Sequence, residues 1–180
     1  WSDGDNYTRG HWLNGRSSSR TLASVVAEVC RRSGVKAFDV SRLYGLVRGY
    51  HVADAGSARS TLQPLMTTYG FEAAERDGTL VFTNRTGQAI ASLDANTLAF
   101  DPDRPTAVSQ TRAPMSEIAA RVQFEFIDSE AGYEGAVTEI ADPRQSTLGL
   151  SRTSVPLALT RAEAQGAVGR WLAETRVGQD

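Results

Sequence analysis

The chain has 180 residues, 41% hydrophobic and 22% charged, with a formal net charge of −2. That length and apolar content suffice for one domain or two small ones with a buried core, and the charge creates no field that would attract nucleic acid or an acidic membrane. No apolar run approaches the ~20 residues that a spanning helix needs, so we predict neither membrane insertion nor specific nucleic-acid binding.

The first sixteen residues are polar and glycine-rich, and we expect an irregular lead-in over 1–16. Because the sequence begins at Trp1, we interpret it as an excised or processed piece of a longer protein. The serines at 17–19 are candidate N-caps for a first helix. This helix is predicted over Thr21–Ser33, since apolar side chains recur there on one helical face, and Gly34 is its expected end.

A β-hairpin over Ala73–Asn84 is the centre of the first half, because Asp77-Gly78 separates two short runs. Before it we expect one helical turn over Asp39–Leu43, a short strand around Leu46–Val52 and a second helix over Ser57–Tyr69. Pro64 falls inside this helix, where a proline costs ~3 kcal/mol. We therefore expect the helix to start nearer Gln63 or to bend there, with both helices covering the apolar side of the hairpin.

The second half reads as a β-rich unit. A weak third strand is expected over 89–93, a proline-bracketed boundary at 101–105 and a strand at 108–112. The clearest strand is Arg121–Ile127, where apolar and polar residues alternate, and Tyr133–Ile140 is its predicted partner. One or two strands broken by Pro156 are expected over 146–159. Thr160 and Glu163 then form a capping box that opens a closing helix.

These elements predict an α+β fold with three parts: a lead-in at 1–16, a helix–strand–helix–hairpin unit at 17–100, and a β-rich unit with a C-terminal helix at 101–180.

Catalytic patterns are absent from the sequence, which contains no P-loop, GxGxxG, HExxH or GxSxG. His11 and His51 have no ligand partner at useful spacing. The single cysteine, Cys30, excludes an internal disulfide and lies on the apolar face of the first helix. We therefore predict no catalytic, cofactor-binding or metal-binding residue, no cofactor and no enzymatic activity.

One stretch, Val122–Pro143, contains no lysine or arginine but several carboxylates. It is either the solvated face of a hairpin, a glycosidase-like carboxylate pair, or an acidic surface that lines a passage or meets an arginine-rich neighbour. We keep all three readings, and the candidate lumen- or partner-facing surface consists of Glu125, Asp128, Glu130, Glu134 and Glu139.

The order of several motifs resembles the hub region of baseplate proteins from long-tailed phages and gene transfer agents. These motifs are HWLNGR, TLASVVAEVCRRSG, VRGY, ARSTLQPLMTTYGFEAAERDGTLVFTNR, and RVQFEFID followed by Tyr133. The similarity runs from about His11 to the final helix. Proteins of that family also carry an upstream TIM-barrel, glycosidase-like domain, which this sequence does not contain.

The resemblance implies a structural role without a catalytic residue. It also implies that the β-rich unit at 101–180 is barrel-like and is completed by chain outside this sequence. Copies of such a segment assemble as a ring, typically a homo-trimer, around the DNA path at the tail tip of a virion made in the bacterial cytoplasm, and their partners are other tail and baseplate proteins. A conduit for DNA should not bind phosphate, so an acidic hairpin facing the lumen would suit this role. The alternative from another class is a carbohydrate-binding module of a cell-wall-degrading protein.

Overall fold

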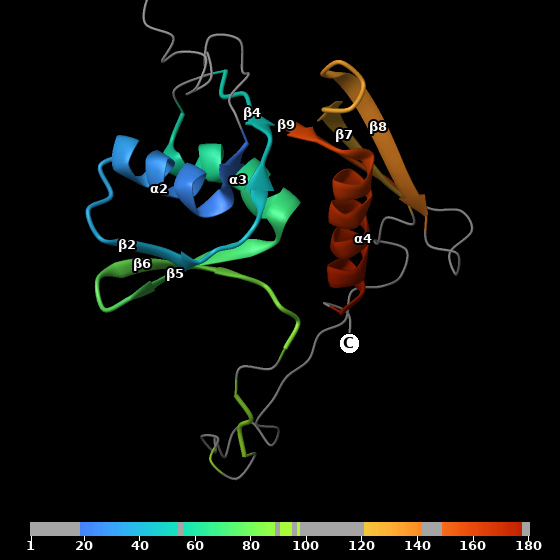
Figure 1. Ribbon diagram of the computed structural model, residues 1–180. Helices are drawn as coiled ribbons and strands as arrows, with labels where there is room; N and C mark the ends of the chain where they lie inside the picture. The colour runs from blue at the N-terminus through green and yellow to red at the C-terminus, as the bar shows by residue number, and fades with distance from the viewer. Residues whose placement is uncertain are drawn as a thin grey trace, which may run out of the picture.

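The computed structural model describes residues 19–53, 56–88, 91–94, 97, 121–141 and 149–177 (Figure 1). Its elements confirm the predicted α+β fold. In chain order they are β1 (Arg20–Thr21), α2 (Leu22–Arg32), β2 (Phe38–Arg42), β3 (Leu46–Val47), β4 (Gly49–Tyr50), α3 (Ala58–Tyr69), β5 (Phe71–Arg76), β6 (Thr79–Asn84), β7 (Arg121–Asp128), β8 (Glu134–Ala141), β9 (Leu150–Leu159) and α4 (Arg161–Val177).

The predicted hairpin is formed by β5 and β6, which pair in register from Phe71↔Asn84 to Arg76↔Thr79. Asp77 and Gly78 make its turn with φ of 50° and 75°. Two consecutive positive φ angles match the twist of antiparallel strands, which is why an Asp-Gly pair is favoured there. On one side of the hairpin, α2 and α3 lie against the sheet β2-β6-β5 (Figure 1).

Two local expectations around the first helix are corrected. The stretch Asp39–Leu43 is not a helical turn, because Phe38–Arg42 forms β2 and pairs with β6 in parallel. The Asp39 carboxylate accepts the Ser41 N–H at 2.8 Å, so its capping capacity is used inside the strand. The first helix is capped by Thr21 rather than by the serines at 17–19, since the Thr21 side chain accepts from the Ser24 N–H.

The second helix runs unbroken through Pro64, so it does not begin there. Its N-cap is Ser57, which accepts the Ser60 N–H, and its C-cap is Gly70 in the left-handed region, with φ of 62°. The weak strand expected over 89–93 is not seen at residues 91–94, which have no regular structure. Residues 89–90 and the strand expected at 108–112 lie outside the described residues.

The second half forms a four-stranded sheet of order β4-β9-β7-β8, with β7 antiparallel to β8 and parallel to β9. The predicted interruption at Pro156 is a bulge within one strand, since the register shifts between Glu125 and Ile127 of β7. The described strands form an open sheet, so completion of a barrel by further chain stays a prediction. α4 runs alongside β7 and β8 (Figure 1), and Val122, Phe124 and Phe126 are buried beneath it.

The two halves share a seam. β4, which belongs to the first half by sequence, pairs with β9 through Gly49↔Ala158 and Tyr50↔Leu157. Arg48 Nε also lies 3.0 Å from a carboxylate oxygen of Glu163 on α4. The hydrophobic core therefore continues from α2 and α3 into α4 without a break. The predicted division of the chain at residue 101 stays a prediction.

Candidate functional site

The five acidic residues singled out in the sequence do not share one face of the sheet. The pairing of β7 with β8 places Glu125 opposite Val137, and Gln123 opposite Glu139. These four positions face away from α4, and we call this side the open face. Asp128 and Glu134 lie opposite each other in the register of β7 and β8, on the side that faces α4. Glu130 lies in the exposed turn between the two strands.

Asp128 is buried rather than part of a surface, because only 1% of the residue is exposed. Its carboxylate accepts hydrogen bonds from Arg161 Nε at 3.0 Å and from the Glu130 N–H at 2.9 Å. The hydrogen bond from the Arg161 guanidinium lowers the pKa of Asp128 from its ordinary value, and the backbone N–H groups of Glu130 and Ala131 lower it further. Asp128 thus holds the start of α4 against the end of β7, and it is not available to a partner.

One half of the open face is internally bonded. Arg152 Nε donates to Gln123 Oε1 at 2.8 Å, and Gln123 Nε2 donates to Glu139 Oε2 at 2.8 Å. Arg121 Nη1 lies 3.8 Å from the other carboxylate oxygen of Glu139. This row crosses β9, β7 and β8 in register, so the charge of Glu139 is largely met within the chain.

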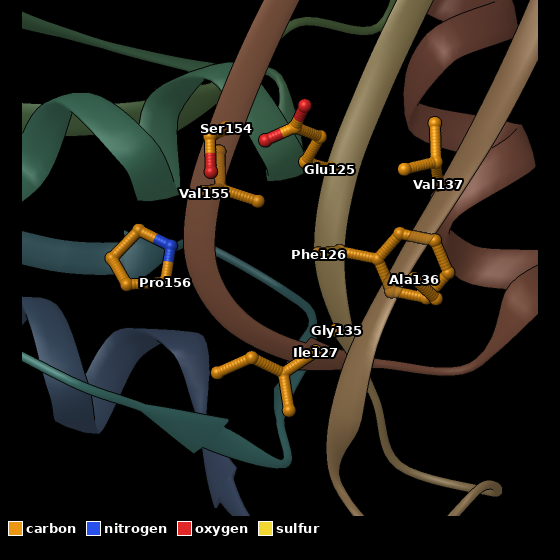
Figure 2. Close-up of a pocket in the computed structure, with 9 residues that line it drawn as sticks. All are labelled: Glu125, Phe126, Ile127, Gly135, Ala136, Val137, Ser154, Val155 and Pro156. Atoms are coloured by element: carbon orange, nitrogen blue, oxygen red, sulfur yellow. The ribbon is translucent and has the colours of Figure 1, made fainter.

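The other half of the open face is a shallow hollow of about 400 Å³ (Figure 2). Its lining is mostly apolar, and among the described residues that line it only Glu125 is ionisable. Figure 2 shows the Glu125 carboxylate on the same side as Ser154, with Ile127 and Pro156 further along. Gly135 adds to the space, since a Cβ built there would meet no atom within 4 Å.

The sequence did not point to this hollow. Its apolar members lie on three strands, and their proximity depends on the parallel pairing of β9 with β7, which no local pattern specifies. Pro156 was the one available signal, because a proline inside a strand marks an edge or a bulge.

No catalytic arrangement is seen in the described part of the chain. Burial raises the pKa of the Cys30 thiol, and the residue is 1% exposed, which fits a packing role. Among the described residues, no cluster of three or more His, Cys, Asp or Glu side chains is placed to hold a metal ion. The helices of that same part are all too short or too polar to cross a membrane. His51 is exposed, and His11 lies outside the described residues.

Comparison with known protein families gives one match. Residues 57–180 match the family described as "Putative phage tail protein". No curated protein sequence matches the chain.

The solved structures that resemble the chain over most of its length include the following two. One is a chain in the virion of a native gene transfer agent particle, with 48% sequence identity, a TM-score of 0.84 and coverage of 99% of this chain. The other is the tail protein from Neisseria meningitidis MC58, with 16% identity, a TM-score of 0.57 and coverage of 88% of this chain. The second likeness concerns the fold alone. This chain spans 40% of the length of the virion chain and 48% of that of the tail protein.

Proposed function

Because this chain belongs to that family of phage tail proteins, we propose that it is a structural component of a phage-like tail, located in the baseplate hub. The resemblance to phage and gene transfer agent tail proteins inferred from its motifs is confirmed. In the proposed arrangement, copies form a ring, a homo-trimer in the full-length particle, around the path of DNA at the tail tip. Its partners are other tail and baseplate proteins.

The observation that carries this proposal is the match to the gene transfer agent virion. An identity of 48% over 99% of this chain, with a TM-score of 0.84, is high enough that the same surfaces would be available for assembly. The site chemistry agrees, because the hollow on the open face has a single ionisable side chain rather than a convergent group of acids, bases and nucleophiles. The proposal is therefore a role through shape and association, without enzymatic activity.

The test is to locate the chain in intact particles. An antibody fragment raised against the purified chain should label the tail tip in electron micrographs, and threefold density there would support the ring. Labelling of the capsid or of the tail shaft would contradict the hub assignment. Particles without the chain at any position would overturn the structural role itself.

Two further measurements separate this proposal from its rivals. A carbohydrate-binding module should release or absorb heat when titrated with soluble peptidoglycan fragments, whereas a hub segment should not. A glycosidase should hydrolyse wall polymer and lose that activity in Glu125→Gln, the one carboxylate in the hollow. We expect neither a binding heat nor hydrolysis.

A further inference from the structure

We infer that the hollow half of the open face, defined by Glu125, Ile127, Val137, Ser154 and Pro156, is the surface on which a second copy of this chain docks through exposed arginines of its helix–strand–helix–hairpin unit. This inference rests on the proposed function and deepens it, since it assigns the contact that would build the ring. It chooses between the two roles open to the acidic surface, a partner contact rather than the lining of a passage.

Glu125 carries a charge that has no partner within the described residues. The described arginines nearest to Glu125 on the open face are already engaged, because Arg152 donates to Gln123 and Arg121 lies beside Glu139. Within the described residues, Glu125 has neither a hydrogen bond nor an ion pair. A carboxylate beside apolar side chains gains most from a cation that arrives together with a surface that excludes water.

The residues around Glu125 in the hollow are mostly apolar. Val137 is 60% exposed although it lies in the middle of β8, and Ile127 and Pro156 are only partly covered. A passage for DNA is wet and gains nothing from exposed valine and isoleucine, whereas the core of a protein interface does. A small ligand is a poorer occupant, because small-molecule sites are enclosed and have converging polar groups, whereas this open hollow offers only the Glu125 carboxylate and the Ser154 hydroxyl among its polar side chains.

The two halves of the chain differ in net charge. Residues 17–100 contain nine basic and seven acidic residues, whereas residues 101–180 contain eight basic and twelve acidic residues. The first half is therefore net positive and the second net negative. Within the described residues, Arg20, Arg59 and Arg76 are exposed and make no ion pair. Arginine suits the contact, since its planar group binds a carboxylate in a bidentate way and is weakly hydrated.

The geometry of such a contact has a consequence for symmetry. The positive half of one copy would meet the negative half of the next, so the two surfaces in contact differ. A contact of this heterologous kind generates a closed ring when its rotation closes, whereas a contact between identical patches gives a twofold dimer. The charge distribution of the chain is thus compatible with the ring, and the ring itself comes from the proposed function.

The experiment is photo-crosslinking in purified particles. A benzophenone amino acid in place of Val137 should join two copies of the chain, and mass spectrometry should map the second copy's attachment to residues 17–100. A cross-link to DNA would place the open face on the passage and overturn the inference. A cross-link to a different protein, or no cross-link in particles that contain the chain, would overturn it as well.

Charge substitutions then test the role of Glu125. Glu125→Arg should lower the yield of cross-linked pairs about tenfold, and one of Arg20→Glu, Arg59→Glu or Arg76→Glu should restore it in the double variant. Glu134→Arg is the matched control, because Glu134 is an exposed carboxylate of the same strand pair on the α4 side. An equal loss in Glu134→Arg, or no loss in Glu125→Arg, contradicts the proposal. Absence of the chain from the particle would instead overturn the proposed function.

Discussion

The carboxylate of Asp128 joins three parts of the chain at the end of β7. It accepts bonds from Arg161 at the start of α4 and from the Glu130 N–H in the turn that leads to β8. Its side chain is 2% exposed, whereas the side chain of Arg161 is 74% exposed. An acidic residue was expected on a surface here, and instead it connects a helix to a sheet.

This arrangement predicts a specific dependence of stability on pH. The bond from Arg161 is the main cause that lowers the pKa of Asp128 in the folded chain, so the unfolded chain, with an ordinary pKa of ~3.9, binds the proton more readily. The stabilisation from Asp128 is thus complete above the unfolded-state pKa and is lost as pH falls through the folded-state pKa. Urea unfolding between acidic and neutral pH should show a shallower acid limb in Asp128→Asn. Parallel curves for the two proteins would contradict this assignment.

Two glycines that end helices offer a matched comparison. Gly70 has a φ of 62°, and a Cβ there would lie 2.6 Å from Arg170 Nε, whereas Gly34 has a φ of 75° and open space around it. Gly34→Ala should cost about 1 kcal/mol, the cost of a left-handed alanine. Gly70→Ala should cost about 2–3 kcal/mol because the guanidinium must also move. Urea unfolding measures both, and equal costs would mean that Arg170 is not held in place.

At the scale of single elements, α3 tolerates a proline that its sequence pattern argued against. Pro64 lies one turn after Ser60, whose carbonyl lacks the usual N–H partner as a result. The interior cost of ~3 kcal/mol is offset in part because proline also restricts the unfolded chain, by ~0.4–1 kcal/mol. Pro64→Ala should therefore stabilise the protein by about 2–2.5 kcal/mol in thermal or urea unfolding. Gln63→Ala is the control, with an expected change near zero. If Pro64→Ala is destabilised, packing of the proline ring contributes more to stability than the missing helical hydrogen bond costs.

The seam between α4 and the first half depends on a pair of partly exposed charges. Arg48 and Glu163 are 3.0 Å apart and each is 35% exposed. Glu163 also accepts the Thr160 N–H at 2.8 Å, so its removal costs more than the pair alone. A double-mutant cycle with Arg48→Ala and Glu163→Ala should give a coupling energy of about 0.5–1 kcal/mol after allowance for solvent screening.

The control for that cycle is a pair within one helix. Arg32 and Glu28 on α2 are 2.7 Å apart but 75% and 51% exposed, so their coupling should stay near ~0.3–0.5 kcal/mol. If the coupling of Arg48 with Glu163 falls below that of the α2 pair, the seam is held by the β4–β9 pairing and by packing rather than by charge.

Elements with strong local signals could be predicted from the sequence. The Asp77-Gly78 turn, the alternation over Arg121–Ile127 and the capping box of Thr160 and Glu163 each follow from neighbours in the chain. β2 could not be predicted in this way, because Phe38–Arg42 is a strand only through its parallel pairing with β6. Nonlocal pairing of this kind leaves no period in a five-residue segment.

The candidate site was predictable only in part for the same reason. The sequence pointed to Glu125 and Glu139 as exposed carboxylates, and strand alternation places both on one face. The sequence does not show that Gln123, itself bonded by Arg152, donates a hydrogen bond to Glu139, while Glu125 has no such partner among the described residues. That arrangement depends on β9 lying beside β7. The burial of Asp128 depends on Arg161, which is 33 positions away in the chain.

At the scale of the whole molecule, the continuous core has a consequence for unfolding. Leu65 of α3 is fully buried in the same core as Val168 and Leu172 of α4. Pairing of β4 with β9 adds backbone bonds across the seam. Opening one half would therefore expose the core of the other, so we expect a single cooperative transition even though the predicted division at residue 101 separates two units.

A reporter in one half and a substitution in the other test this expectation. Replacing Trp1 and Trp12 by phenylalanine leaves Trp171 of α4 as the sole tryptophan. Leu65→Ala in α3 removes a fully buried side chain and should cost about 2–5 kcal/mol. In a cooperative molecule the urea midpoint seen by Trp171 fluorescence falls together with that seen by far-UV circular dichroism. An unchanged Trp171 midpoint would mean that the halves unfold independently, and the seam would then be a docking contact between two domains rather than the interior of one.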